Sequence, residues 1–126
     1  MKRAACAILG LCVLVTASAA AHHSYDAFDR NDEMTIEGRL ETLLYANPHV
    51  MLTIKAADGQ AYTAEWGNLV NLGRAGVTKG TLKEGDAVVV VGVPTRDRSL
   101  HRLSLLKEIR RPGDGWAWKR PQPVAQ

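Results

Sequence analysis

The chain has 126 residues, of which 46% are hydrophobic and 6% aromatic, and its formal net charge is +3. This length suits one domain with one modest core and excludes a second domain. So small a positive charge gives no electrostatic support to a nucleic-acid partner, and we expect none.

The first 21 residues have the three parts of a secretory signal peptide. Lys2 and Arg3 form a positive start, residues 4–15 are apolar and residues 16–21 are small. The apolar run is shorter than the roughly 20 residues that span a bilayer, so we expect cleavage and no membrane insertion. Loss of Lys2 and Arg3 lowers the net charge from +3 to +1. We therefore predict a periplasmic protein.

Signal cleavage has three acceptable positions, after Ala19, Ala20 or Ala21. Both cysteines, Cys6 and Cys12, precede all three, so the processed protein has no disulfide and no thiol chemistry. The alternative is a lipidated Cys12, but bulky Leu11 stands where such sites need a small residue. A freely diffusing exported domain is favoured.

The next segments alternate with the period of a β-strand. Met34, Ile36, Leu40 and Leu44 share one face of the first predicted strand, and Gly38 between them indicates a bulge or bend. Such a bend allows one long strand to serve two sheets. Apolar alternation over residues 50–54 predicts a second strand, and residues 61–66 predict a third after the turn at 57–59.

A short helix is predicted after these strands. Asn68 caps its start, Leu69, Val70 and Leu72 bury one side, and Gly76 ends it. The unbroken valine run at 88–91 is typical of a central strand buried on both faces. Residues 100–108 predict a last strand, and the sequence rich in Pro and Gly at 112–126 predicts an irregular tail.

This order of elements predicts a mainly β fold, a small five-stranded OB-like Greek-key barrel with one short helix between strands 3 and 4. The barrel domain covers residues 22–111, after the signal peptide at 1–21 and before the tail at 112–126. An open α+β sandwich is the alternative. We prefer the barrel because closure removes the exposed edges of so small a sheet.

His22 and His23 lie directly after the cleavage positions. A cut after Ala19 or Ala20 places a histidine third, where the amine, two amides and the imidazole offer four in-plane nitrogens that suit Cu(II) or Ni(II). A cut after Ala21 places His22 first, so its amine and ring chelate one ion and His23 adds a second imidazole. Every cut therefore predicts copper binding. The alternative is that both histidines are merely polar residues of a chain terminus.

His49 is the third candidate ligand. It lies on the face opposite to Val50, Leu52 and Ile54, so it should point outward. A terminal segment folded back over the barrel would bring His22 or His23 to His49, with Met51 as a soft neighbour suited to reduced copper. In the alternative interpretation His49 only caps the turn after Asn47 and Pro48. We expect His101 to be structural.

The aromatic residues favour two interpretations. Tyr45, Tyr62 and Trp66 can form an exposed platform for a glycan, or they can pack in the core, which is the simpler explanation. Trp116 and Trp118 point the same way in an extended tail, either onto the barrel or toward a partner. No HExxH motif, phosphate-binding glycine loop or Ser–His–acid arrangement is found, and Glu65 alone establishes no reaction, so we do not predict an enzyme.

Several motifs together resemble a family of small exported bacterial proteins of unknown function. They are "HHSYDAFD", "EGRL", "NPHV", "EWGNLVNLGRAG", "LKEGDAVVVVGVPTRDRS" and the closing "GDG". The resemblance implies an OB-like fold and leaves the activity unassigned. Members often have a "WTNPH"-like run where this chain has "LYANPH", so Tyr45 takes the place of that aromatic ring. The positions that the family pattern marks are His22, His23, Ser24, Phe28, Asp29, Asn47, Pro48, His49, Trp66, Asp97 and Ser99.

The residues and the resemblance lead to one main hypothesis and one alternative. The main hypothesis is an exported protein that binds a small ligand, in its sharpest form a copper ion held by His22, His23 and His49. The alternative is a periplasmic envelope module that docks a protein or a glycan through the barrel face.

Overall fold

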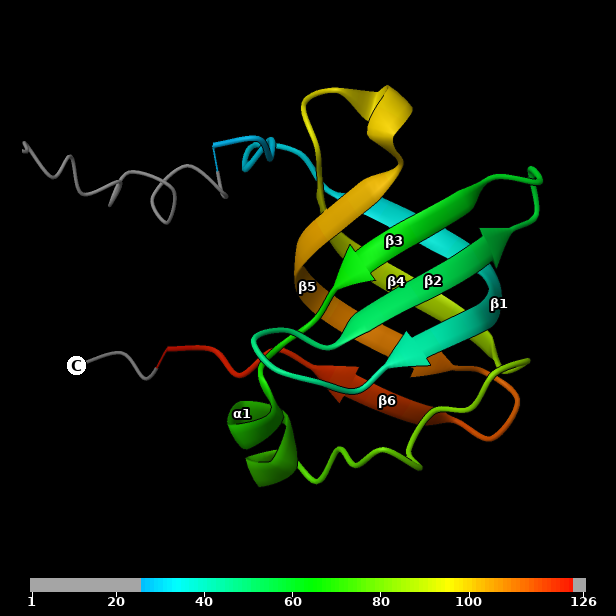
Figure 1. Ribbon diagram of the computed structural model, residues 1–126, viewed down its shortest axis with the longest axis vertical. Helices are drawn as coiled ribbons and strands as arrows, with labels where there is room; N and C mark the ends of the chain where they lie inside the picture. Colours follow the sequence, from blue (N-terminus) through cyan, green and yellow to red (C-terminus); the bar gives the residue numbers. More distant parts are fainter. Residues whose placement is uncertain (1–25, 124–126) are drawn as a thin grey trace, which may run out of the picture.

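The computed structural model describes residues 26–123, in which the strands close into a barrel with a short helix at one end (Figure 1). The predicted signal peptide, its cleavage positions and Cys12 lie outside these residues. The elements are β1 (Met34–Leu44), β2 (Met51–Ala56), β3 (Ala61–Glu65), α1 (Leu69–Arg74), β4 (Ala87–Pro94), a 3₁₀ turn (Arg98–Leu100), β5 (Arg102–Arg111) and β6 (Trp116–Lys119).

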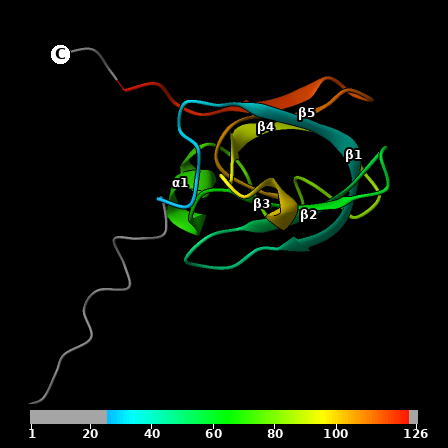
Figure 2. The same cartoon turned by 90° about the horizontal axis from the view of Figure 1, so that it is seen from above.

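The barrel closes as the sequence predicts. The strand order is β3-β2-β1-β4-β5-β6, and a parallel pairing of β3 with β5 joins the two ends of the five-stranded part. Seen from above, β1 to β5 surround a common interior (Figure 2). The OB-like barrel is therefore confirmed, and the open sandwich is wrong. Among residues 26–123, no helix has the length and apolar character needed to cross a membrane.

Strand β1 belongs to both halves of the barrel. Its first part, from Met34 to Arg39, pairs with β4, and its second part, from Gly38 to Leu44, pairs with β2. Gly38 lies in both ladders, and a Cβ atom there would collide with the backbone carbonyl of Lys55. The predicted shared strand is confirmed, and close approach of β2 is the reason for its glycine.

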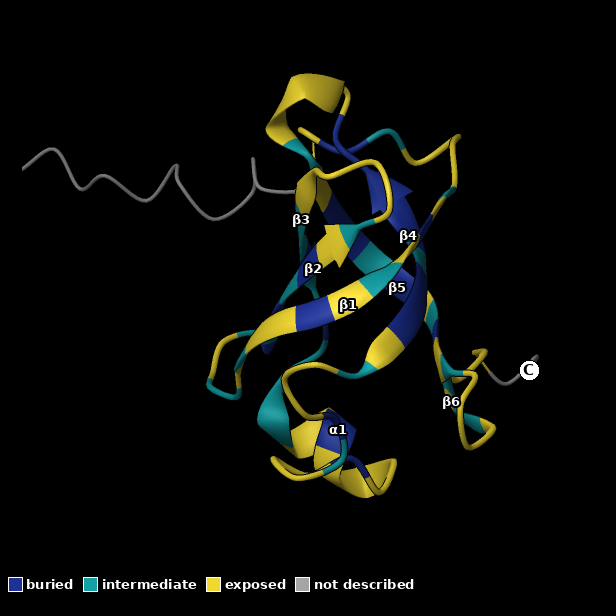
Figure 3. Cartoon of the chain, turned by 90° about the vertical axis from the view of Figure 1, so that its right-hand side faces the viewer, coloured by how far each residue is buried: buried dark blue, intermediate teal, exposed yellow. Residues whose placement is uncertain are grey.

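The bulge in β1 lies beyond this glycine. The register shifts between Leu40 and Thr42, so Glu41 is the extra residue. Ile36 and Leu40 are buried as expected, and Figure 3 shows β1 alternating between buried and exposed segments. After the bulge the alternation reverses. Leu43 packs against the core while Leu44, predicted to face inward, is 61% exposed.

Helix α1 begins and ends where the sequence predicts. The Asn68 side chain accepts a hydrogen bond of 2.8 Å from the Asn71 amide, and Gly76 adopts the left-handed φ of 76° that ends many helices. Leu72 is buried, with Leu69 one turn before it on the same side. Val70 was expected on that face but is 58% exposed, because position 70 lies about 100° around the helix from position 69.

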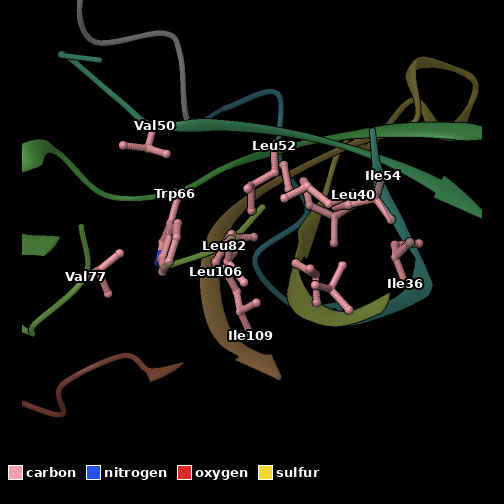
Figure 4. Packing of buried hydrophobic residues seen from close by; sticks show 14 of the residues in the cluster. Ile36, Leu40, Val50, Leu52, Ile54, Trp66, Val77, Leu82, Leu106 and Ile109 are labelled. Carbon is pink, nitrogen blue, oxygen red and sulfur yellow. The ribbon is translucent and has the colours of Figure 1, made fainter. Parts of the chain in front are cut away.

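Strand β4 is the central strand that the valine run predicts. It pairs with β1 on one side and β5 on the other, and Val88 and Val90 point into the core cluster. Val89 and Val93 on the opposite face are also buried. The core fills the barrel and continues toward α1, with Trp66 and Val77 at that end (Figure 4).

The C-terminal segment differs from the prediction. The last barrel strand runs to Arg111 rather than ending at 108, and the expected irregular tail at 112–126 contains strand β6, which pairs with β5 through Trp118 and Ile109. Gly115, with φ of 75°, completes the turn between the two strands. In β6, Trp116 and Trp118 are partly buried, and Ala117 and Lys119 are exposed. This alternation is that of a half-buried strand, despite the Pro and Gly residues around it.

Candidate functional site

The segment that follows the N-terminal histidines is fixed to the barrel. Phe28 is 4% exposed and forms an isolated bridge with Thr95. On either side of it the Asp29 amide donates to the Pro94 carbonyl, and the Arg96 amide donates to the Ala27 carbonyl, both at 2.8 Å. The chain leading to His22 and His23 therefore leaves the barrel beside the end of β4. The two histidines themselves lie outside the described residues.

Ion pairs also hold this segment against the barrel. Arg98 lies 2.6 Å from an Asp32 carboxylate oxygen and 3.6 Å from Asp29. The carboxylate of Asp97 accepts hydrogen bonds from the Ser99 hydroxyl and amide, and these two bonds lower the pKa of Asp97. Asp29, Asp97 and Ser99, which the resemblance marks, thus make structural contacts in this chain.

His49 is positioned by an extension of the β2–β3 ladder. The Val50 amide donates to the Gly67 carbonyl at 3.0 Å, and the Trp66 amide donates to the Val50 carbonyl at 2.8 Å. Val50 points into the core, so His49 must point outward, as predicted. The orientation of His49 therefore follows from the backbone and from the burial of its neighbour.

The His49 ring contacts one carboxylate. Its Nδ1 atom lies 3.1 Å from Oε1 of Glu65, and the two side chains are 38% and 16% exposed. Nδ1 is the ring nitrogen that faces this carboxylate, and Nε2 lies on the other side of the ring. A carboxylate beside one ring nitrogen is an arrangement often found around metal-binding imidazoles.

Glu65 connects His49 to the docked N-terminal segment. Its Oε2 atom lies 4.0 Å from the guanidinium of Arg102, and Met51 is its direct partner in the β2–β3 register. The Arg102 carbonyl accepts from the Thr95 amide at 3.0 Å, and Thr95 bridges Phe28. A continuous set of contacts therefore runs from His49 to the segment that leads to His22 and His23.

The loop before His49 is hydrogen-bonded to helix α1. The side chain of Asn47 accepts a hydrogen bond of 3.0 Å from the Leu69 amide at the start of α1, and the Asn47–Pro48 peptide is cis. Asn47 therefore joins the loop to the helix. The side chain of His49 makes its contact with Glu65 rather than with the turn, so the alternative of a turn-capping histidine is not what the contacts show.

The other candidate residues lie elsewhere or in the core. His101 packs its ring against Tyr62 with centroids 5.0 Å apart. Tyr45 donates its hydroxyl proton to the Val77 carbonyl, Trp66 is buried, and all three predicted platform rings pack against the core cluster. Core packing of Tyr62 and Trp66 is thus confirmed. Within residues 26–123, no three His, Cys, Asp or Glu side chains form a cluster that could hold a metal ion.

Sequence reasoning missed the pairing of Glu65 with His49. The sequence showed a carboxylate beside Trp66 but not which strand position it would face. The turn at 57–59 could have predicted this pairing, because it sets the register of β2 and β3. That register places Met51 opposite Glu65, and His49 lies two residues before Met51 on the same face.

A comparison with protein families places the chain in a family of unknown function. Residues 11–104 match a family model described as a family of unknown function, DUF6152. No curated protein matches the chain.

Proposed function

The chain belongs to the DUF6152 family of unknown function, and we propose that it is an exported protein that binds one copper ion through His22, His23 and His49. One observation carries the proposal. The Nδ1 atom of His49 lies 3.1 Å from Glu65, which leaves Nε2 directed away from its carboxylate partner. Metal-ligating histidines commonly donate their second ring proton to a carboxylate in this way.

The position of the docked segment supports the sharing of one ion. Asp26 is the first described residue, and its carbonyl accepts a hydrogen bond of 3.1 Å from Arg96. The backbone from Asp26 back to His23 covers at most about 10 Å. The contacts from Phe28 through Thr95 and Arg102 to Glu65 span the same side of the barrel. The proposal requires this short segment to bring His23 and His22 to His49.

The donor set favours copper. The terminal amine, amide nitrogens and imidazoles are nitrogen ligands in the arrangement that Cu(II) prefers, whichever of the three cuts is used. Met51 lies beside Glu65 in the register, where its thioether provides a soft ligand suited to reduced copper. Glu65 does not need to bind the ion, because its role in the proposal is to orient the ring through the 3.1 Å contact with Nδ1.

The first test measures copper retention and thermal stability together. The processed protein should begin at residue 20, 21 or 22, retain one Cu(II) per chain by native mass spectrometry, and melt at a higher temperature with copper than without it. The His49→Ala variant should lose most of this increase. Glu65→Gln should retain copper with an affinity about 10- to 100-fold lower, because the oriented ring has lost its charged partner.

The control is His101→Asn. His101 has a φ of 46°, a left-handed conformation that asparagine tolerates, and its ring contacts Tyr62 rather than the proposed site. This variant should show the full copper-dependent increase. Copper uptake with an unchanged melting temperature would mean that the terminus binds alone, and the proposal would be wrong. Absence of retained copper would equally reject it and favour the envelope interaction module.

A further inference from the structure

A hollow lies between α1 and the chain that follows β6. Its volume is 460 Å³, and Figure 1 shows both segments at the same end of the barrel. None of its lining residues belongs to the proposed copper site. They are Gly67, Asn71, Leu72, Arg74, Ala75, Trp118, Arg120 and Pro121. We call this hollow the α1–β6 cleft.

Two buried indole groups beside the cleft lack a hydrogen-bond acceptor. The Nε1 atoms of Trp66 and Trp118 are both buried, and neither has a partner among residues 26–123. The two rings meet edge to face with centroids 5.3 Å apart, and Trp118 lines the cleft directly. Figure 4 shows the Trp66 nitrogen on the side of the ring nearest Val77, which follows α1. Buried indole N–H groups usually have a hydrogen-bond acceptor, so these two donors are available to one.

The charges around the cleft favour a negatively charged ligand as the hydrogen-bond acceptor. Arg74 and Arg120 line it, and no lining residue is acidic. Arg120 donates from Nε to the Leu106 carbonyl at 2.7 Å, which fixes its side chain and leaves its terminal amino groups for a ligand. Arg74 makes no hydrogen bond or ion pair with the described part of the chain. Among residues 26–123, the lining of the cleft therefore carries positive charge without an acidic side chain.

We propose that the α1–β6 cleft binds a small organic carboxylate. The carboxylate lies between the guanidinium groups of Arg74 and Arg120, and the apolar body of the ligand packs against Leu72, Trp118 and Pro121. The volume of 460 Å³ falls within the range of small-molecule sites, which are mostly apolar with a few directed polar groups. This site shares no residue with the proposed copper site.

Binding has a spectroscopic signature. Because both indole nitrogens are covered, a carboxylate oxygen reaches Nε1 of Trp118 only when that ring shifts slightly. The resonance of the Trp118 indole N–H, and that of Trp66 in contact with it, should then move on binding. Trp116 is the internal reference, because its ring contacts the Arg111 guanidinium and does not line the cleft.

The test is a titration of the ¹⁵N-labelled, processed protein with benzoate and, separately, with hexanoate, followed through the three indole N–H resonances. Trp116→Phe assigns the reference signal. We expect saturable shifts for Trp118 and Trp66 with a dissociation constant of about 1 mM or tighter for at least one probe. Benzyl alcohol, which has the ring without the charge, should bind at least about tenfold more weakly.

The matched variants change one charge each. Arg74→Gln should weaken carboxylate binding about tenfold, whereas Lys79→Gln, on an exposed residue that does not line the cleft, should leave it unchanged. Both substitutions are at exposed positions and should preserve the fold. The proposal is overturned if neither carboxylate gives a saturable shift. It is equally overturned if benzyl alcohol binds as well as benzoate, or if Arg74→Gln binds as tightly as the unsubstituted protein.

Discussion

Arg111 shows how single residues join separate parts of this small fold. Its guanidinium lies 2.9 Å from Asp86, before β4, and 2.9 Å from Asp114, in the β5–β6 turn, and it donates to the Thr81 carbonyl at 2.7 Å. A hydrogen bond from the Lys83 amide is the main cause that lowers the pKa of Asp86, and Arg111 lowers it further. The hydrogen bond from Arg111 is likewise the main cause that lowers the pKa of Asp114.

These lowered pKa values predict a loss of stability in acid. A carboxyl group whose pKa is lower in the folded state stabilises the fold above its ordinary value of 3.8, and this contribution is lost as the pH falls through the folded-state pKa. The unfolding free energy should therefore fall below about pH 4. Asp86→Asn should make this acid dependence shallower, as measured by denaturant unfolding at a series of pH values. Glu84→Gln, at a neighbouring exposed carboxylate without a hydrogen bond among the described residues, should keep the full dependence.

At the scale of elements, β1 and β6 show where sequence patterns are sufficient and where they are not. Alternation correctly placed Ile36 and Leu40 inside, because local burial decides the face of each residue. It could not place Leu44, since the extra residue Glu41 arises from barrel closure and has no local signal. Strand β6 was missed for a related reason. The four residues that follow Gly115 form a strand only because β5 offers a free edge.

The bulge at Glu41 predicts opposite roles for two adjacent leucines. Leu43→Ala should reduce the unfolding free energy by about 1–2 kcal/mol, because a side chain packed against the core is lost. Leu44→Ala should change it by less than about 0.5 kcal/mol, since that side chain is mostly exposed. Chemical denaturation of both variants measures these changes in unfolding free energy. A larger loss for Leu44→Ala than for Leu43→Ala would show that the bulge is not at Glu41.

For the whole molecule, sequence patterns predicted the barrel, the capped helix and the outward position of His49. They could not predict the pairing of His49 with Glu65, because it depends on the register of two strands. Nor could they predict the α1–β6 cleft, which exists because β6 and the chain after it return to α1. The two proposed sites share no residue, although Gly67 of the cleft accepts a hydrogen bond from Val50, which is next to His49.

The central claim is that His49 completes a copper site begun by the N-terminal histidines. Its most direct test is the Cu(II) dissociation constant of the processed protein and of its His49→Ala and His101→Asn variants, measured by competition with a chelator of known affinity. We predict that His49→Ala weakens binding at least about tenfold, the loss of one imidazole ligand, while His101→Asn binds like the unsubstituted protein. Equal affinities for all three proteins would show that the terminus binds copper without the barrel and would contradict the claim.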